Sequence, residues 1–88
     1  MGMARMSAFR PWSRRTAESE VKPGNRYRRH LDGGLVATAT VLGVRPDLSG
    51  IAHVRFAVAV EGTAAARSDG TRILALQSFA DMYRERIP

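Results

Sequence analysis

The chain has 88 residues and a mass of 9.7 kDa, enough for one small domain, because a second hydrophobic core would need roughly 50 further residues. Hydrophobic residues make up 44% and charged residues 25% of the chain, values close to those of globular proteins, so wholesale disorder is not expected. Fourteen basic and eight acidic residues give a formal charge of +6, and every basic residue except Lys22 is arginine. This balance favours an anionic partner.

The chain has no cysteine, which excludes disulfides, cysteine-ligated metal sites and a thiol nucleophile. No apolar run approaches the ~18 residues of a membrane-spanning helix, since Arg45, Asp47, His53 and Arg55 interrupt the most hydrophobic half. The first residues lack the apolar stretch of a secretory signal, and Met6 stands where myristoylation needs Ser or Thr. They are Arg-rich like organelle transit peptides, but the Ala, Arg and Gly bias also fits a GC-rich bacterial genome. We therefore expect a protein of the bacterial cytoplasm.

Residues 1–21 are interpreted as a flexible basic tail that precedes a domain at residues 22–88. The tail has four arginines against two glutamates, and Pro11 prevents any amphipathic turn around Phe9 from continuing as a helix. An exposed tryptophan in a flexible segment is more often an anchor than an unused side chain. The tail is therefore predicted to contact a partner through aromatic and basic side chains: Phe9, Trp12, Arg14 and Arg15.

From Lys22 onward, turn signals alternate with β-rich runs, a pattern typical of antiparallel hairpins. The predicted strands are residues 25–31, 35–45, 51–60 and 72–76. A turn at Pro23-Gly24-Asn25 is expected to open the domain. Two further turns are expected between the first and second strands, at Asp32-Gly33-Gly34, and between the second and third, at residues 46–50. Gly43 is expected to mark a bend or bulge. Residues 61–71 are predicted to be a connection with a turn at Ser68-Asp69-Gly70.

Alternation assigns side chains to the two faces of these strands. In residues 51–60 one face is large and apolar: Val54, Phe56, Val58 and Val60. In residues 35–45 the inner face is small, with Leu35, Ala37, Ala39 and Val41, and the outer face is half apolar because it carries Val36, Leu42 and Val44.

A short helix is predicted to end the domain. Ser78 followed by Asp81 is a passable N-cap, and four apolar residues then share one helical face: Phe79, Met82, Tyr83 and Ile87. Two strands of about ten residues would each span roughly 33 Å if flat, too long for this domain unless the sheet coils. We therefore expect a small curled antiparallel barrel of about four strands, with the helix as its lid.

The domain resembles small bacterial SH3-like barrel domains of unknown function over residues 22–87. The resemblance rests on Gly24, Tyr27, Arg28, Val41-Leu42-Gly43, Val54-Arg55-Phe56, Leu74, Leu76, Phe79 and Met82-Tyr83. These positions are structural, so the resemblance implies a fold of this type and no catalytic activity.

Residue types that carry catalysis are sparse in this sequence. There are two histidines, and neither is spaced to activate a serine or threonine. Asp81 and Glu85 form a like-charge pair on the predicted helix, more consistent with a solvated face than with acid–base chemistry. Phosphate-loop and dinucleotide fingerprints are absent. We expect no enzyme activity, no cofactor and no small-molecule substrate.

Two histidines and one aspartate could in principle form a metal site. His30 and Asp32 have the same-face spacing of a strand and, with His53, would supply two imidazoles and one carboxylate. Asp32, however, belongs to a predicted turn, and His30 ends a strand. The structural interpretation is favoured, and no metal ligand is assigned.

The positive signal is a basic block with one aromatic residue inside it. Four positions are singled out as candidate binding residues: Arg26, Tyr27, Arg28 and Arg29. Alternation puts Arg26, Arg28 and His30 on one face, where they could follow a phosphate backbone while Tyr27 packs inward or stacks a base. Arg45 and Arg55 could extend this strip. Basic proteins also carry arginines that are merely solvated.

Two functions follow, both non-enzymatic. The first is a small binding module or accessory subunit that docks on a protein, or on a second copy of itself, through the barrel surface and the tail. The alternative is nucleic-acid binding, in particular RNA binding, through the Arg-rich strip and the tail. A third hypothesis, attachment to a membrane surface, rests on the tail alone. Protein interaction is favoured because no RNA-binding motif with stacked aromatics is present.

Overall fold

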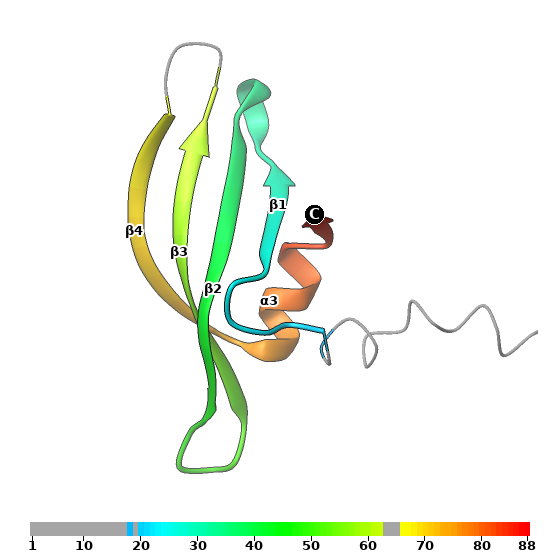
Figure 1. Cartoon of the computed structure of the whole chain (residues 1–88), viewed down its shortest axis with the longest axis vertical. Coiled ribbons are helices and arrows are strands. Elements are labelled where there is room, and N and C mark those ends of the chain that lie inside the picture. The colour runs from blue at the N-terminus through cyan, green and yellow to red at the C-terminus, as the bar shows by residue number, and fades with distance from the viewer. Residues whose placement is uncertain (1–17, 19, 63–65) are drawn as a thin grey trace, which may run out of the picture.

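The computed structural model describes residue 18, residues 20–62 and residues 66–88. They form five strands and one α-helix: β1 (Arg26–His30), β2 (Val36–Pro46), β3 (Ala52–Glu61), β4 (Ala66–Ala75), α3 (Leu76–Met82) and β5 (Glu85–Ile87). The strands make one antiparallel sheet in the order β4-β3-β2-β1-β5 (Figure 1). The mainly β class, the antiparallel pairing and the short helix near the C-terminus are thus confirmed.

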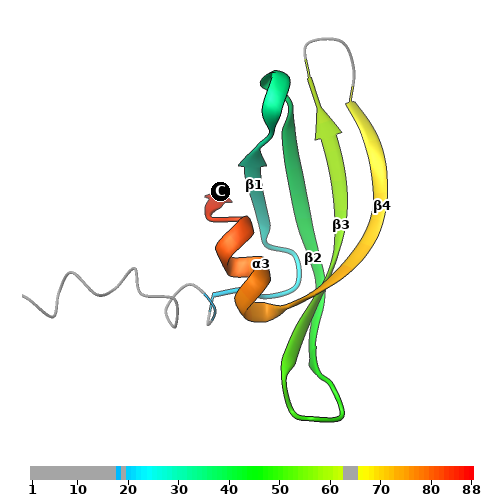
Figure 2. The same ribbon diagram turned by 180° about the vertical axis from the view of Figure 1, so that it is seen from behind.

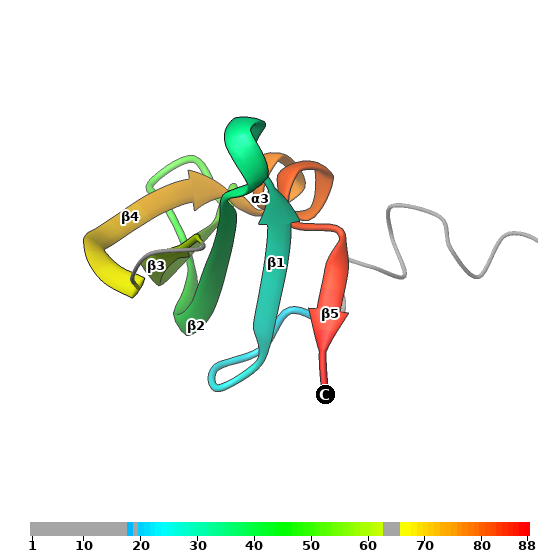
Figure 3. The same cartoon turned by 90° about the horizontal axis from the view of Figure 1, so that it is seen from above.

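The sheet curls around α3 but does not close. Figure 3 shows α3 lying in the concave side of the sheet, with β4 and β5 at its two ends. In the described part of the chain these two strands are the edges, and no pairing joins them. The long β2 and β3 do coil, as their length requires. The likeness to SH3-like barrels stays a prediction.

The sheet has five strands rather than about four because residues 85–87 leave the predicted helix. α3 ends at Met82, and β5 then pairs with β1 in the register Arg26–Ile87 and Arg28–Glu85. Without β5, the N–H and C=O groups on that edge of β1 would have no partner in the sheet. Ile87 therefore lies on a strand and not on the helix face.

β4 is longer than predicted. It begins at Ala66 and contains the segment Ser68-Asp69-Gly70, which was expected to form a turn. The register between β3 and β4 shifts here, because Ala57 pairs with Thr71 and Ala59 with Ser68. Gly70 has a φ of 87°, a conformation that both tight turns and certain bulges require. The same residues therefore signal a bulge rather than a turn.

A second bulge, the one expected at Gly43, changes which side chains of β2 face α3. Val41 pairs with Phe56, but Gly43 pairs with Arg55 and Val44 with Val54, so one extra residue lies between the pairs. Val44 consequently packs against the core, whereas Leu42 is 42% exposed. The prediction that Val44 lies on the outer face was wrong, because an extra residue reverses the alternation beyond it.

The core lies between α3 and the face of the sheet that we call the inner face. Phe79 is fully buried, and its ring centroid lies 5.5 Å from that of Tyr27, 4.8 Å from that of Phe56 and 5.1 Å from that of Tyr83. The apolar face predicted for β3 is buried here, namely Val54, Phe56, Val58 and Val60. This confirms the alternation and fixes the opposite, outer face as the one that α3 leaves uncovered.

The helix differs from its prediction in two further respects. Its N-cap is Ala75, without a side-chain hydrogen bond, so Ser78 lies inside the helix. Met82 is 43% exposed, whereas Phe79 and Tyr83 are buried. A seven-residue helix presents only about two turns, and the pair spaced by four residues takes the central position over the sheet.

Candidate binding surface

The basic block on β1 is divided between the two faces of the sheet. Arg26, Arg28 and His30 lie on the outer face, as alternation predicted, opposite Thr40, Thr38 and Val36 of β2. Tyr27 lies on the inner face and is only 6% exposed. Its hydroxyl donates a 3.1 Å hydrogen bond to the carbonyl of Glu20. Tyr27 therefore packs inward and does not offer its ring to a base.

Arg29 also lies on the inner face. Its guanidinium carbon is 5.7 Å from the centroid of the Tyr83 ring, within the range of a cation–π contact. Burial raises the pKa of the Tyr83 hydroxyl, so the ring remains neutral at physiological pH. Arg29 thus covers an edge of the core and does not extend the outer strip.

Glu85 neutralises much of the strip that remains. Its carboxylate accepts a 2.8 Å hydrogen bond from Arg28 and lies 3.7 Å from Nε2 of His30. The Arg28 hydrogen bond lowers the pKa of Glu85, and the same bond raises the pKa of Arg28. The sequence did not point to this contact, because it depends on β5, which alternation in a three-residue segment does not reveal.

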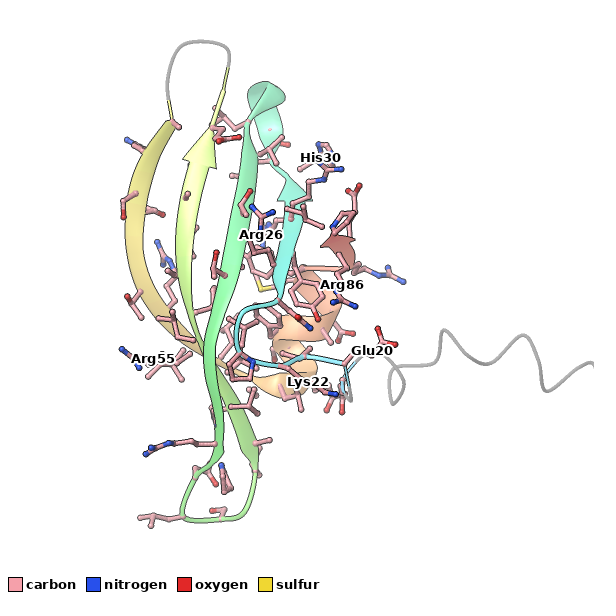
Figure 4. The ribbon with its side chains drawn as sticks, viewed as in Figure 1. Glu20, Lys22, Arg26, His30, Arg55 and Arg86 are labelled. Atoms are coloured by element: carbon pink, nitrogen blue, oxygen red, sulfur yellow. The ribbon has the colours of Figure 1, made fainter. Side chains whose placement is uncertain are left out.

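Arg45 and Arg55 lie further along the same outer face. Arg55 pairs with Gly43 and Arg45 pairs with His53, so the two arginines are diagonal neighbours on β2 and β3. Figure 4 shows Arg55 pointing away from α3, well below Arg26 and His30 of β1. Among the described residues neither Arg45 nor Arg55 has an ion pair. The register therefore places two uncompensated cations on the uncovered face.

These two arginines belong to the end of the β2–β3 hairpin, residues 42–55, which we call the arm. The base of the arm is paired with β4, and Figures 1 and 2 show its far end, around the turn, projecting beyond α3 and beyond the neighbouring strands. It is built by the bulge at Gly43 and by a tight turn after Pro46, which together let two strands continue past the core.

The turn at the tip of the arm is held by Asp47. Its Oδ1 accepts hydrogen bonds from the backbone N–H groups of Ser49 (2.8 Å) and Ile51 (2.9 Å). The backbone adds a 2.9 Å bond between Asp47 N–H and the Ile51 carbonyl, and Gly50 supplies a φ of 84°. The bond from Ile51 is the main cause that lowers the pKa of Asp47. The tip is consequently a defined loop with an ionised carboxylate inside it.

Large apolar side chains gather at the arm without cover. Six large hydrophobic residues are exposed in the described part of the chain, and four of them lie in the arm or directly beside it: Leu42, Leu48, Ile51 and Ile73. Leu48 is fully exposed at the tip, and Ile73 is 63% exposed opposite Arg55. Of these residues only Leu42 is predicted from the sequence to be an exposed apolar side chain; Ile73 is placed beside Arg55 by the pairing of β4 with β3.

A notch of about 380 Å³ opens on the outer face where the arm begins. Its lining combines cationic, apolar and turn residues: Gly43, Arg45, Pro46, Asp47, His53, Arg55 and Ile73. His53 is held at its edge, with Nδ1 2.9 Å from the Ile51 carbonyl and 3.7 Å from Asp47 Oδ2. The notch therefore offers two free guanidinium groups beside aliphatic surface.

The residues weighed as a metal site do not meet. His30 pairs with Val36 and His53 with Arg45, at opposite ends of β2, and Asp32 lies in a 3₁₀ turn. Within the described residues, no three His, Cys, Asp or Glu side chains are grouped to hold a metal ion.

The tail residues Phe9, Trp12, Arg14 and Arg15 lie outside the described residues. No helix of the described chain is long and apolar enough to cross a membrane. Comparison of the sequence and structure with known protein families, curated proteins and solved structures finds no match.

Proposed function

We propose that this chain is a non-enzymatic docking module that binds a protein partner through the arm. The observation that carries the proposal is the group of exposed aliphatic side chains at Leu42, Leu48, Ile51 and Ile73. Large exposed apolar side chains concentrated in one region of a surface, with polar residues beside them, mark an interaction site. Arg45 and Arg55 supply such a rim, and arginine is enriched at protein interfaces.

The turn geometry supports this use of the tip. Leu48 stands on a loop whose backbone conformation is held by the Asp47 hydrogen bonds, so little backbone entropy remains to be lost on binding. A rigid aliphatic anchor that enters a pocket on a partner is a common source of binding energy. We expect the partner in the bacterial cytoplasm, as the composition suggests.

RNA binding remains the second candidate, and Arg26, Arg45 and Arg55 on one face are its support. Single-stranded RNA is bound largely by stacking on aromatic side chains. All four aromatic residues in the described chain, Tyr27, Phe56, Phe79 and Tyr83, are buried in the core. Protein docking is therefore preferred.

A site-specific crosslink tests the proposal. A photoreactive amino acid in place of Leu48, or in place of Leu35 as an exposed control away from the arm, is irradiated in lysate of the source organism. A protein captured at position 48 alone is then purified, and its affinity is measured for wild type and for Leu48→Ser with Ile51→Ser. We expect at least tenfold weaker binding by the double variant.

Two results would overturn the proposal. One is equal affinity of wild type and the double variant for the captured protein. The other is capture of nucleic acid in place of protein, with tight binding of a labelled 20-nucleotide RNA whose affinity falls linearly with salt on logarithmic axes.

A further inference from the structure

Gly43 occupies a strand position that does not require glycine. Its φ is outside the left-handed region, and a Cβ added to it would meet no atom within 4 Å. Glycine inside a strand weakens the strand and often marks a bulge, or a place where a ligand or another backbone approaches closely. Gly43 lies at the bulge of β2, but neither a positive φ nor crowding requires a glycine there, so the space in front of it is open to a ligand.

That space is the notch. Across the outer face, Gly43 pairs with Arg55, and Arg55 pairs with Ile73 on β4. A side chain at position 43 would stand on the same face as these two residues and occupy the opening between Arg55 and Arg45. The absence of a side chain at Gly43 thus keeps the notch open beside Arg45 and Arg55, which both line it.

The lining selects a ligand with an aliphatic stem and one negative charge. Ile73 and Pro46 are exposed and would contact methylene groups, and the guanidinium groups of Arg45 and Arg55 have no ion-pair partner among the described residues. Arginine binds carboxylates with paired, charge-assisted hydrogen bonds. Glutamate has both parts, a two-carbon stem and a carboxylate.

The same lining carries a negative charge that disfavours binding of a polyanion. The Asp47 carboxylate lies at the notch and is held ionised by the backbone N–H groups of its turn. Asp47 repels any anion near it, and this repulsion is larger for a phosphate backbone, which carries a charge at every nucleotide, than for a single carboxylate bound at Arg45 and Arg55. Charge and shape therefore favour an acidic protein segment over RNA at this place.

We propose that the notch is the anchor pocket of the docking surface and that it receives a glutamate side chain from an acidic segment of the protein partner. This inference rests on the proposed function, and it names the chemistry of the partner at one point of the arm. Leu48 and Ile51 at the tip then contact the partner's apolar surface beyond the acidic segment.

The test uses the ¹⁵N-labelled full chain and two synthetic peptides, acetyl-Glu-Leu-Glu-Leu-Glu-amide and its counterpart with glutamine in place of glutamate. Amide chemical shifts are followed during titration. We expect saturable shifts at Gly43, Arg55 and Ile73 with the glutamate peptide, and at least tenfold weaker binding of the glutamine peptide. Equal binding of both peptides would contradict the recognition of a carboxylate.

Substitutions at position 43 test the notch itself. Gly43→Val fills the opening and is expected to weaken binding of the glutamate peptide at least tenfold. The control Thr40→Val lies on the same face of β2 but away from the notch, and it should leave binding of the peptide unchanged. Both variants should melt within a few degrees of wild type. If Gly43→Val misfolds, Gly43→Ala adds one methyl group and is expected to weaken binding severalfold. Wild-type affinity in a folded Gly43 variant would refute the assignment.

The captured partner separates this inference from the proposed function. If Leu48→Ser with Ile51→Ser weakens binding of the partner while Gly43→Val does not, the assignment of the notch as a glutamate pocket is refuted and the docking function stands. If neither variant weakens binding of the partner, both the docking function and the glutamate pocket are refuted. If the 20-nucleotide RNA shifts the notch amides and the glutamate peptide does not, the pocket binds phosphate and the glutamate assignment is wrong.

Discussion

The two faces of the sheet use the same strands for different purposes. On β2, Ala39 and Val41 face α3 and are at most 1% exposed, whereas Leu42, the next residue, is 42% exposed on the other side. Every buried aromatic ring of the described residues lies between the inner face and α3, and the outer face carries arginines and uncovered aliphatic groups. One short helix can cover only one face of a sheet, so the fold is stabilised on one side and the other side is available for a partner.

The largest expected effect comes from removing the centre of the covered face. Phe79→Ala should lower the free energy of unfolding by about 3 to 5 kcal/mol, because it leaves a cavity among three aromatic rings. Ile73→Ala on the outer face should change the same quantity by no more than about 0.5 kcal/mol. Urea denaturation of both variants measures the contrast, and similar losses would mean that the outer face also stabilises the fold.

The bulge at Gly43 makes a sharper comparison between neighbouring residues. Val44→Ser should lower the free energy of unfolding by about 1 kcal/mol, since Val44 is half-buried against the core. Leu42→Ser should be within about 0.5 kcal/mol of wild type. Strict alternation without a bulge places Val44 and Leu42 on one face, so equal effects in urea denaturation would argue against the observed register.

A smaller, opposite effect is expected at the bulge itself. Gly43→Ala should raise the free energy of unfolding by up to about 0.5 to 1 kcal/mol, because alanine has less backbone freedom to lose and its Cβ meets no neighbour. Thermal melting detects this gain. A clear loss of stability would show that Gly43 is required by the fold, and the notch would then need no functional explanation.

The smallest effect concerns Glu85, on the exposed edge of the outer face. Its pKa is lowered in the folded state, mainly by the hydrogen bond from Arg28, so its contribution is present above the unfolded pKa of about 4.3 and is lost as the pH falls. Glu85→Gln should therefore lower the melting temperature slightly at pH 7 and by less at pH 3, which lies below the unfolded pKa. The pair is exposed, which keeps the difference small and salt-sensitive. A difference that is as large at pH 3 as at pH 7 would exclude this cause.

Sequence periodicity predicts the covered face well and the uncovered face poorly. The alternation from Val54 to Val60 assigns four core residues correctly, because burial on one face imposes a period of two. Gly43 is recognisable as a bulge, but its consequence for Val44 is not, since the number of extra residues depends on pairing with β3.

The candidate site is harder to predict because it depends on strands that are distant in the sequence. The ion pair between Glu85 and Arg28 spans 57 positions, and Ile73 reaches Arg55 through the pairing of β4 with β3. Local propensity favours a helix from Ser78 through Ile87, and the unpaired edge of β1 overrides it after Met82. The basic block was identifiable in sequence, whereas its division between two faces and its partial neutralisation were not.

The central claim is that the uncovered face binds a protein partner at the arm. The most direct measurement is an amide chemical-shift map of the ¹⁵N-labelled full chain, titrated with the purified partner captured at position 48. The account predicts shifts concentrated at residues 42–55 and at Ile73, with α3 unchanged. Shifts confined to β1 and β5, or to the face covered by α3, would contradict it.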